Sequence, residues 1–301
     1  MLDAHAELGE GPVWDDGRRV LWWVDIMAGR VHCFDPMAGL DRAYEMGTPV
    51  GCVALRDDGR LAVAAADALL TLDPETGAIE TLVPFERVAV AVRCNDGKCD
   101  PLERLWIDRM AFDRAAGAGT LVRFDGSRFE TILGGLTIPN GLAWSGDGRR
   151  MYFVDSHDPV ISVLDFDMES GAVERRRPFV RLVDVPEWPR RGVPDGLTVD
   201  AEDCVWAAAW GGGCVLRFGP DGTFIGRIEV PVSRVSSCSF GGDDLSELFI
   251  TTAWEDATAE ELAAQPNAGG LFRARPGVRG RPARRCKIGV GTPGDVESGA
   301  L

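Results

Sequence analysis

Four side chains with oxygen donors occupy matching positions, counted from the turn that follows each of them. Asn140 in PNGLAWSGDG and Asp195 in PDGLTVDAED lie eight residues before the end of that turn, and Asn95 in RCNDGKCDPLER has the same spacing. Glu10, in LGEGPVWDDG, lies seven residues before its turn glycine, and Gly51 takes this position in a further unit. Asparagine or aspartate before glycine is also a common turn signal, because these side chains bind their own backbone. Glutamate is a poor turn residue, however, and the recurrence of all four favours a shared polar centre.

Two carboxylates and two amides make a donor set for a hard divalent cation. Calcium binds carboxylates, amide carbonyls and water, so calcium is the first expectation. Magnesium, manganese and iron are alternatives, and zinc is a less natural guest because the set holds no thiolate or imidazole. Glu10, Asn95, Asn140 and Asp195 are therefore the candidate metal ligands.

Short apolar runs alternate with turn residues along the whole chain, and these runs must position the polar side chains. Six of them have the character of β-strands, and most follow a turn cluster such as DDGRR or GDGRR. They lie at 20–25, 61–66, 105–110, 151–156, 205–210 and 248–253. Most precede a second strand, at 30–36, 69–74, 120–126, 160–167, 214–222 and 270–277.

The spacing of these units predicts an all-β fold, a six-bladed β-propeller. The runs start about 40 to 54 residues apart, which is the period of propeller blades. Each small antiparallel sheet buries its faces by packing against its neighbours around an axis, whereas a stack of β-sandwich domains would not explain a fixed repeat. We predict one domain over 1–290, a helical turn within 255–265 and a disordered tail over 291–301. Because the innermost strand of a blade runs along the axis, the four polar positions should meet at one mouth of the central channel.

Composition argues against several classes of function. The chain of 301 residues carries a net charge of −15, so its surface repels phosphate backbones and nucleic-acid binding is not expected. The start MLDAHAELGE has no apolar run, and no stretch approaches the ~20 apolar residues of a membrane span, which predicts a cytoplasmic protein. The eight cysteines form no CxxC pair and should be reduced, and three histidines give little support to a catalytic triad. A Walker loop and a GxSxG motif are absent.

Motifs along nearly the whole chain resemble the gluconolactonase and regucalcin (senescence marker protein) family. They are LGEGPVWD, RCNDGKCDP, PNGLAWSGDGRRMYFVDS, PDGLTVDAEDCVWAAAWGGGCVLRF and QPNAGGLF. That family is a six-bladed propeller with one catalytic divalent cation on its axis, and many members hydrolyse sugar-acid lactones. The resemblance implies metal ligation by Glu10, Asn140 and Asp195. It also implies substrate contacts from Arg93 and Asn95, with Asn95 also near the metal.

Two positions depart from the family pattern near the expected sugar pocket. Members commonly have Gly-Thr after the first strand of the third blade, where this chain has Asp108 and Arg109. If these two residues line the pocket, they favour the binding of a polyhydroxylated lactone over an apolar one. If they pair with each other or with neighbours at the surface, the pair contributes little to the stability of the protein. The resemblance also implies that Asp113 takes the place of an acidic substrate-contacting residue in the following loop, with a shorter side chain than the Glu of some relatives. Arg109 and Asp113 are therefore candidate substrate-binding residues, together with Arg93 and Asn95.

The expected reaction is metal-dependent hydrolysis of a small sugar-acid lactone, as by an aldonolactonase. The cation acts as a Lewis acid on the carbonyl and acidifies a water, and Asp195 is the candidate general base. The guanidinium group of Arg93 can donate several hydrogen bonds to the substrate, and the alternative is an ion pair with Asp96. Lys98 is expected to be exposed to solvent. A phosphotriesterase-type metal hydrolase and a non-enzymatic calcium-binding propeller are the alternatives. A substrate panel separates the first from a lactonase, and any metal-dependent turnover removes the second.

Overall fold

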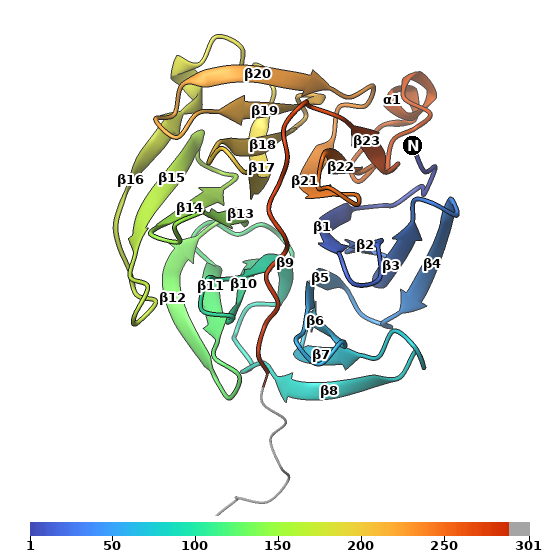
Figure 1. Ribbon diagram of the computed structural model, residues 1–301, viewed down its shortest axis with the longest axis vertical. Helices are drawn as coiled ribbons and strands as arrows, with labels where there is room; N and C mark the ends of the chain where they lie inside the picture. Colours follow the sequence, from blue (N-terminus) through green and yellow to red (C-terminus); the bar gives the residue numbers. More distant parts are fainter. Residues whose placement is uncertain (289–301) are drawn as a thin grey trace, which may run out of the picture.

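Residues 1–288, which the computed structural model describes, form six small β-sheets in a ring around a central axis (Figure 1). Five of the sheets have four antiparallel strands and the last has three, and in every sheet the strands are hydrogen-bonded in chain order. This is the predicted six-bladed β-propeller. The predicted tail over 291–301 lies outside the described residues.

Each blade begins with its innermost strand and continues outward. Blades 1 to 3 consist of β1 (Gly9–Asp15), β2 (Val20–Asp25), β3 (Arg30–Asp35) and β4 (Leu40–Glu45); β5 (Val50–Leu55), β6 (Leu61–Ala65), β7 (Ala68–Leu72) and β8 (Ile79–Pro84); and β9 (Val92–Cys99), β10 (Leu105–Ala111), β11 (Gly119–Phe124) and β12 (Phe129–Leu136). Blades 4 to 6 consist of β13 (Pro139–Trp144), β14 (Arg150–Asp155), β15 (Val160–Phe166) and β16 (Val173–Arg181); β17 (Val193–Val199), β18 (Val205–Trp210), β19 (Cys214–Phe218) and β20 (Phe224–Glu229); and β21 (Val235–Gly241), β22 (Glu247–Thr252) and β23 (Phe272–Ala274). A 3-10 helix (Leu182–Asp184) follows β16, and the helix α1 (Ala259–Ala264) lies inside the predicted helical turn.

The burial of the strands follows their sequence character. The inner strand β6 reads LAVAA and is buried at every position, as expected for a strand covered on both faces. The outer strand β20 reads FIGRIE, and its residues alternate between half-buried and exposed. The six predicted first runs are the second strands of the six blades, and β2 has the predicted bounds of 20–25.

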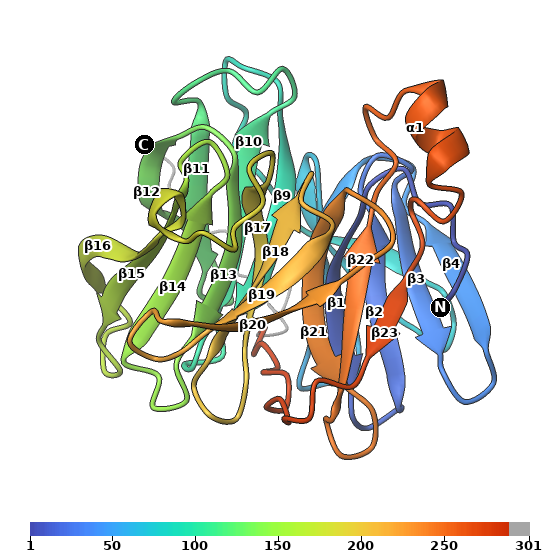
Figure 2. The ribbon, with the colours of Figure 1, turned by 90° about the horizontal axis from the view of Figure 1, so that it is seen from above.

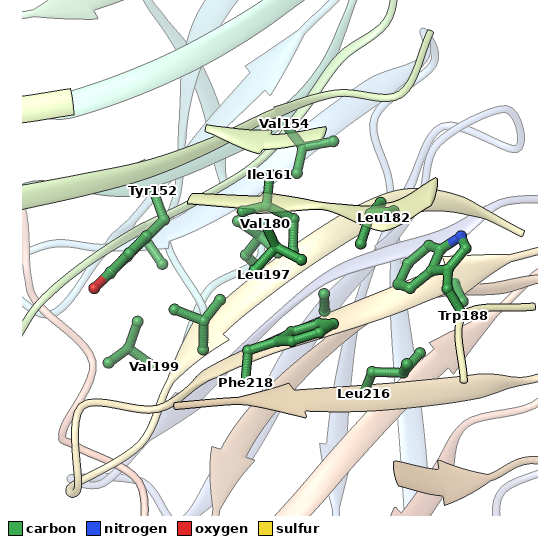
Figure 3. Close-up of a cluster of buried hydrophobic side chains, with 14 of the residues drawn as sticks. Tyr152, Val154, Ile161, Val180, Leu182, Trp188, Leu197, Val199, Leu216 and Phe218 are labelled. Carbon is green, nitrogen blue, oxygen red and sulfur yellow. The ribbon is translucent and has the colours of Figure 1, made fainter. Parts of the chain in front are cut away.

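Six hydrophobic clusters hold the ring together, one between each pair of neighbouring blades. Figure 3 shows the cluster between blades 4 and 5, where Tyr152 and Ile161 meet Leu197 and Phe218. A blade therefore buries both faces only when it has two neighbours, which makes closure of the ring part of the fold. The eight cysteines are all free, and each except Cys33 is buried. No helix among the described residues is long and apolar enough to cross a membrane.

Two terminal segments complete the ring. The N-terminal segment pairs with blade 6, where the Leu2 N–H donates to the Leu271 oxygen at 2.8 Å. The segment after β23 crosses the ring (Figure 1) and reaches blade 2, where Cys286 forms a bridge with Arg56. This crossing segment supplies part of the lining of a cavity of about 330 Å³, formed otherwise by the later residues of the inner strands. It therefore lies at the end of the channel toward which the inner strands run, and the candidate site lies at their beginnings.

Candidate active site

Each innermost strand changes its register at the position of the candidate residues. The shift lies between Asn140 and Leu142 in β13, and between Pro194 and Leu197 in β17, which encloses Asp195. It begins at Glu10 in β1 and occurs at Asn95 in β9. β-bulges of this kind leave residues outside the ladder and re-aim their side chains. The recurring polar positions are therefore bulges that direct side chains toward the axis.

In the second blade the residue at the polar position is not the one predicted from the sequence. Counting back from the turn gives Gly51. In the structure, however, Val50 is the last paired residue before the bulge of β5, as Asn140 is before the bulge of β13. Val50 is thus the equivalent of Asn140, and Gly51 is the equivalent of Gly141. The count fails because the bulge in β5 lies one residue farther from the end of its strand than the bulge in β13 does. Blade 2 consequently contributes no polar ligand.

The glycines that follow Asn140 and Asp195, and Gly51 in blade 2, are required by the close approach of neighbouring inner strands. A Cβ on Gly141 would overlap the backbone oxygen of Asp195 in the next blade. A Cβ on Gly196 would likewise overlap the side chain of Ser237, and one on Gly51 would overlap the backbone of Cys94. The Gly in the PNG and PDG motifs thus lets β13, β17 and β21 pack tightly enough to bring their polar residues together.

Gly141→Ala is expected to lower both stability and activity. The new methyl group must push β17 away, and overpacking of this kind costs about 1–3 kcal/mol. The same displacement moves Asp195, so activity falls as well. Urea unfolding and lactone turnover measure the two effects. Gly226→Ala is the matched control, because a Cβ on this strand residue meets nothing within 4 Å. Equal free energies of unfolding for the two variants would contradict this explanation.

The candidate residues line one cavity at the mouth of the channel. Its volume is about 340 Å³. Its polar lining includes Glu10, Arg93, Asn95, Asn140 and Asp195, which come from blades 1, 3, 4 and 5. The rest of the lining consists of Leu8, Met110, Arg114, Ile138, Ser156, His157, Val193, Trp210 and Glu255. The structure therefore brings the four predicted ligands and Arg93 together.

Buried negative charge is concentrated at the floor of this cavity. Glu10 and Asp195 are only 3% and 4% exposed. Burial, followed by the charges of Asp195 and Asp96, holds the pKa of Glu10 well above its usual range. Burial and then the charge of Asp96 raise the pKa of Asp195 well above its ordinary value, partly offset by the hydrogen bond from Asn140 and the charge of Arg93. Desolvated carboxyl groups that repel one another in this way are stabilised by a cation between them.

The two asparagines have different surroundings. The Asn140 amide nitrogen donates to the Ser156 hydroxyl at 3.2 Å and to Asp195 Oδ1, and its oxygen accepts from the Gly141 N–H at 3.0 Å. Asn95 is held at both ends, since its oxygen accepts from Arg93 Nη1 at 2.6 Å and its nitrogen donates to the Pro139 oxygen at 2.9 Å. Arg93 thus orients Asn95 in the cavity wall, and Asn140 is the amide in direct contact with a carboxylate.

These donors fit a divalent cation. Two carboxylates would offset its charge, and the remaining donors are the hard oxygens that calcium prefers. Residues 1–288 contain no group of three or more His, Cys, Asp or Glu side chains that could hold a metal ion, so a cation here would also need amide oxygens or water. Asn140 would have to present its oxygen, which is half a rotation of the amide group away.

Comparison with known proteins shows the family of the chain. Residues 8–254 match the family described as SMP-30/Gluconolactonase/LRE-like region. The chain belongs to this family. It is 35% identical to pentonolactonase XacC of Haloferax volcanii, over 97% of this chain and 98% of the relative. It is 36% identical to a 6-deoxy-6-sulfogluconolactonase of Pseudomonas putida, over 91% of this chain and 92% of the relative. Among solved structures, a calcium-binding regucalcin of Agrobacterium tumefaciens aligns with a TM-score of 0.88 and 28% identity over 95% of each chain.

Two of the predicted substrate-binding residues lie outside the cavity of this family member. The Arg109 guanidinium stacks over the Phe85 ring, with its carbon 4.6 Å from the ring centroid. Asp113 is exposed, and its carboxylate accepts from the Ala115 N–H at 3.1 Å. Asp108 is fully buried, and within residues 1–288 neither of its carboxylate oxygens has a hydrogen-bond partner. Burial raises its pKa well above the usual range. Asp108 and Arg109 therefore do not line the cavity, and they do not form the surface pair that was the alternative expectation.

Other polar residues near the axis were not predicted from the sequence. Lys98 is not in solvent, because its Nζ donates to the Leu197 oxygen of blade 5 at 2.6 Å. Asp96 and Lys98 line the cavity of about 330 Å³ at the other end of the channel. Arg114 and Glu255 line the cavity at the mouth of the channel, and no local sequence motif marks either of them. Glu255 also lies one residue beyond the segment that matches the family.

Proposed function

We propose that this protein hydrolyses a sugar-acid lactone with the help of a divalent cation. The proposal is carried by the convergence of Glu10, Asn140 and Asp195 from three blades, beside Arg93 and Asn95, in a single cavity. The names of the two lactonase relatives, each aligned over more than nine-tenths of this chain, support a lactone as substrate. Calcium is the first candidate for the cation because the candidate ligands Glu10, Asn140 and Asp195 offer oxygen donors.

The residues of the chain have separate roles in this reaction. A cation held by Glu10, Asn140 and Asp195 would polarise the lactone carbonyl and lower the pKa of a neighbouring water. Asp195 would accept the proton of the attacking water through the carboxylate oxygen that does not bind the cation. Arg93 uses only Nη1 for hydrogen bonds within the described part of the chain, so its other N–H groups can donate to the substrate. Those donors suit both sugar hydroxyls and the carboxylate of the product.

A panel of lactones tests the proposal. Opening a lactone yields an acid, so a pH indicator follows the reaction in weakly buffered solution. We expect one or more pentono- or hexonolactones to be opened in the presence of calcium, manganese, magnesium or zinc, and turnover to stop after chelation. A phosphotriester is included to identify a hydrolase of the other class. If metal is bound but no lactone is opened with any of the four ions, the proposed function is wrong.

A further inference from the structure

Two loops from opposite blades meet over the mouth of the cavity. Arg114 lies in the loop between β10 and β11 of blade 3, and Glu255 and Asp256 follow β22 of blade 6. Arg114 Nη2 lies 3.2 Å from Glu255 Oε2 and 2.9 Å from Asp256 Oδ2. Blades 3 and 6 face each other across the ring (Figure 1), and both loops rise from the same edge of the molecule (Figure 2). A direct contact between these blades must therefore pass over the axial site.

The two carboxylates that contact Arg114 are in different positions. The Glu255 side chain is 15% exposed and lines the cavity. The Asp256 side chain is 64% exposed and is not part of the lining. The backbone also fixes Glu255, because its N–H donates to the Glu7 oxygen at 2.9 Å and that of Trp254 donates to the same oxygen at 3.1 Å. Glu255 is thus a held carboxylate that faces the cavity from the side opposite Arg93.

Glu255 is paired with cations rather than with the other carboxylates of the cavity. Burial raises the pKa of Glu255 above its ordinary value, and the charges of Arg114 and Arg93 partly offset this. Glu10 and Asp195, in contrast, are the carboxylates that a cation would bind. The apolar part of the cavity lining is formed by Leu8, Met110, Ile138, Val193 and Trp210. Glu255 and Arg114 therefore add a hydrogen-bond acceptor and a hydrogen-bond donor to a cavity whose lining also includes these five apolar residues.

We propose that Glu255 and Arg114 bind the hydroxyl groups of the lactone at the mouth of the cavity and determine the preference for polyhydroxylated substrates. This inference rests on the proposed lactonase function. Hydroxyl groups can take the place of part of the Arg114–Glu255 contact, donating to the carboxylate and accepting from the guanidinium. An apolar lactone would desolvate both charged groups without offering a partner to their remaining donors and acceptors, which opposes its binding.

The experiment compares a hydroxylated with an unsubstituted lactone. The substrates are the sugar lactone that the wild-type protein opens fastest and δ-valerolactone, and the variants are Glu255→Ala, Glu255→Gln and Arg114→Gln. We expect Glu255→Ala to lower kcat/KM for the sugar lactone by about 10- to 100-fold, as for a lost hydrogen bond to a charged group, and to change that for δ-valerolactone by less than about threefold. Calorimetry with the sodium salt of the product acid should show the same loss of affinity. Asp256→Asn is the matched control, since it removes the exposed partner of the same arginine and should change neither substrate by more than about twofold.

The outcomes distinguish the two proposals. If the wild-type protein opens no lactone, the proposed function fails and this inference fails with it. If the wild-type protein opens sugar lactones but Glu255→Ala and Glu255→Gln keep its preference and its affinity for the product, this inference alone fails. It also fails if Asp256→Asn reduces the preference as much as Glu255→Ala does. Glu255→Gln keeps the size of the side chain, so it remains informative if Glu255→Ala disturbs the loop.

Discussion

Asp195→Asn is expected to reduce kcat/KM for a sugar lactone by about 100- to 10,000-fold, the range that a positioned general base contributes. The substitution removes the group that takes the proton of the attacking water. It also removes one of the two negative charges that would hold the cation, so metal affinity falls as well. Turnover with saturating metal and metal content by elemental analysis measure these effects separately. Asp221→Asn is the matched control, because Asp221 is exposed and its carboxylate accepts from the Thr223 N–H of its own turn.

Glu10→Gln separates the loss of a charge from the loss of the base. Glu10 contributes a carboxylate to the cavity floor but has no role in proton transfer, so its replacement should weaken metal binding and leave activity recoverable at high metal concentration. Asp195→Asn should not recover under the same conditions. An Asp195→Asn protein with full metal content and wild-type turnover would show that Asp195 is not the base.

The bulges explain why the polar centre was predictable from the sequence. Asn140 and Asp195 each precede a glycine that packs against the next blade, and this local requirement repeats with the blade. A residue at a repeated bulge faces the axis whichever blade it belongs to, so matching positions in the chain imply matching positions in space. Gly51 shows the limit of this reasoning, because a bulge that lies one residue farther from the end of its strand moves the count by one residue.

Arg109 shows why a residue of the second strand of a blade does not reach the rim of the cavity, the place predicted for it. Along β10 the side chains alternate, so Arg109 shares a face with Ile107, which packs in the cluster with blade 2. Asp108 shares the opposite face with Trp106, which packs in the cluster with blade 4. Both faces of a blade are therefore covered by neighbouring blades, and from this strand the mouth is reached only near its end, by Met110, and from the loop beyond it, by Arg114.

Arg114 and Glu255 could not be found from the sequence for a different reason. They are separated by 141 residues and belong to loops outside the repeat. Their contact depends on the closure of the ring, which places blades 3 and 6 on opposite sides of one mouth. No local pattern specifies how long a loop must be to cross that mouth, so the pair becomes visible only in three dimensions.

Removal of the metal is expected to lower the melting temperature by roughly 5–10 °C. A cation that binds only the folded protein stabilises it by about 2.7 kcal/mol at a hundred times its Kd, and each kcal/mol shifts Tm by about 2–4 °C in a protein of this size class. The ligands come from blades 1, 4 and 5, so the cation also links blades that otherwise meet through their apolar faces. Melting curves before chelation, after chelation and after addition of calcium or manganese measure the effect.

The chelated protein should in addition lose stability as the pH rises. Without a cation, the folded-state pKa values of Glu10 and Asp195 lie well above their ordinary range, because the groups are buried and repel one another. The folded state therefore binds more protons than the unfolded state above the ordinary carboxyl pKa of about 4, and its stability falls from there up to the raised values. A bound cation stabilises the ionised forms and removes this slope. Asp195→Asn, with one of the repelling charges gone, should show a shallower slope after chelation and a smaller gain in Tm from calcium. Identical melting curves with and without chelator across this pH range, with metal removal verified, would mean that no cation binds between these carboxylates.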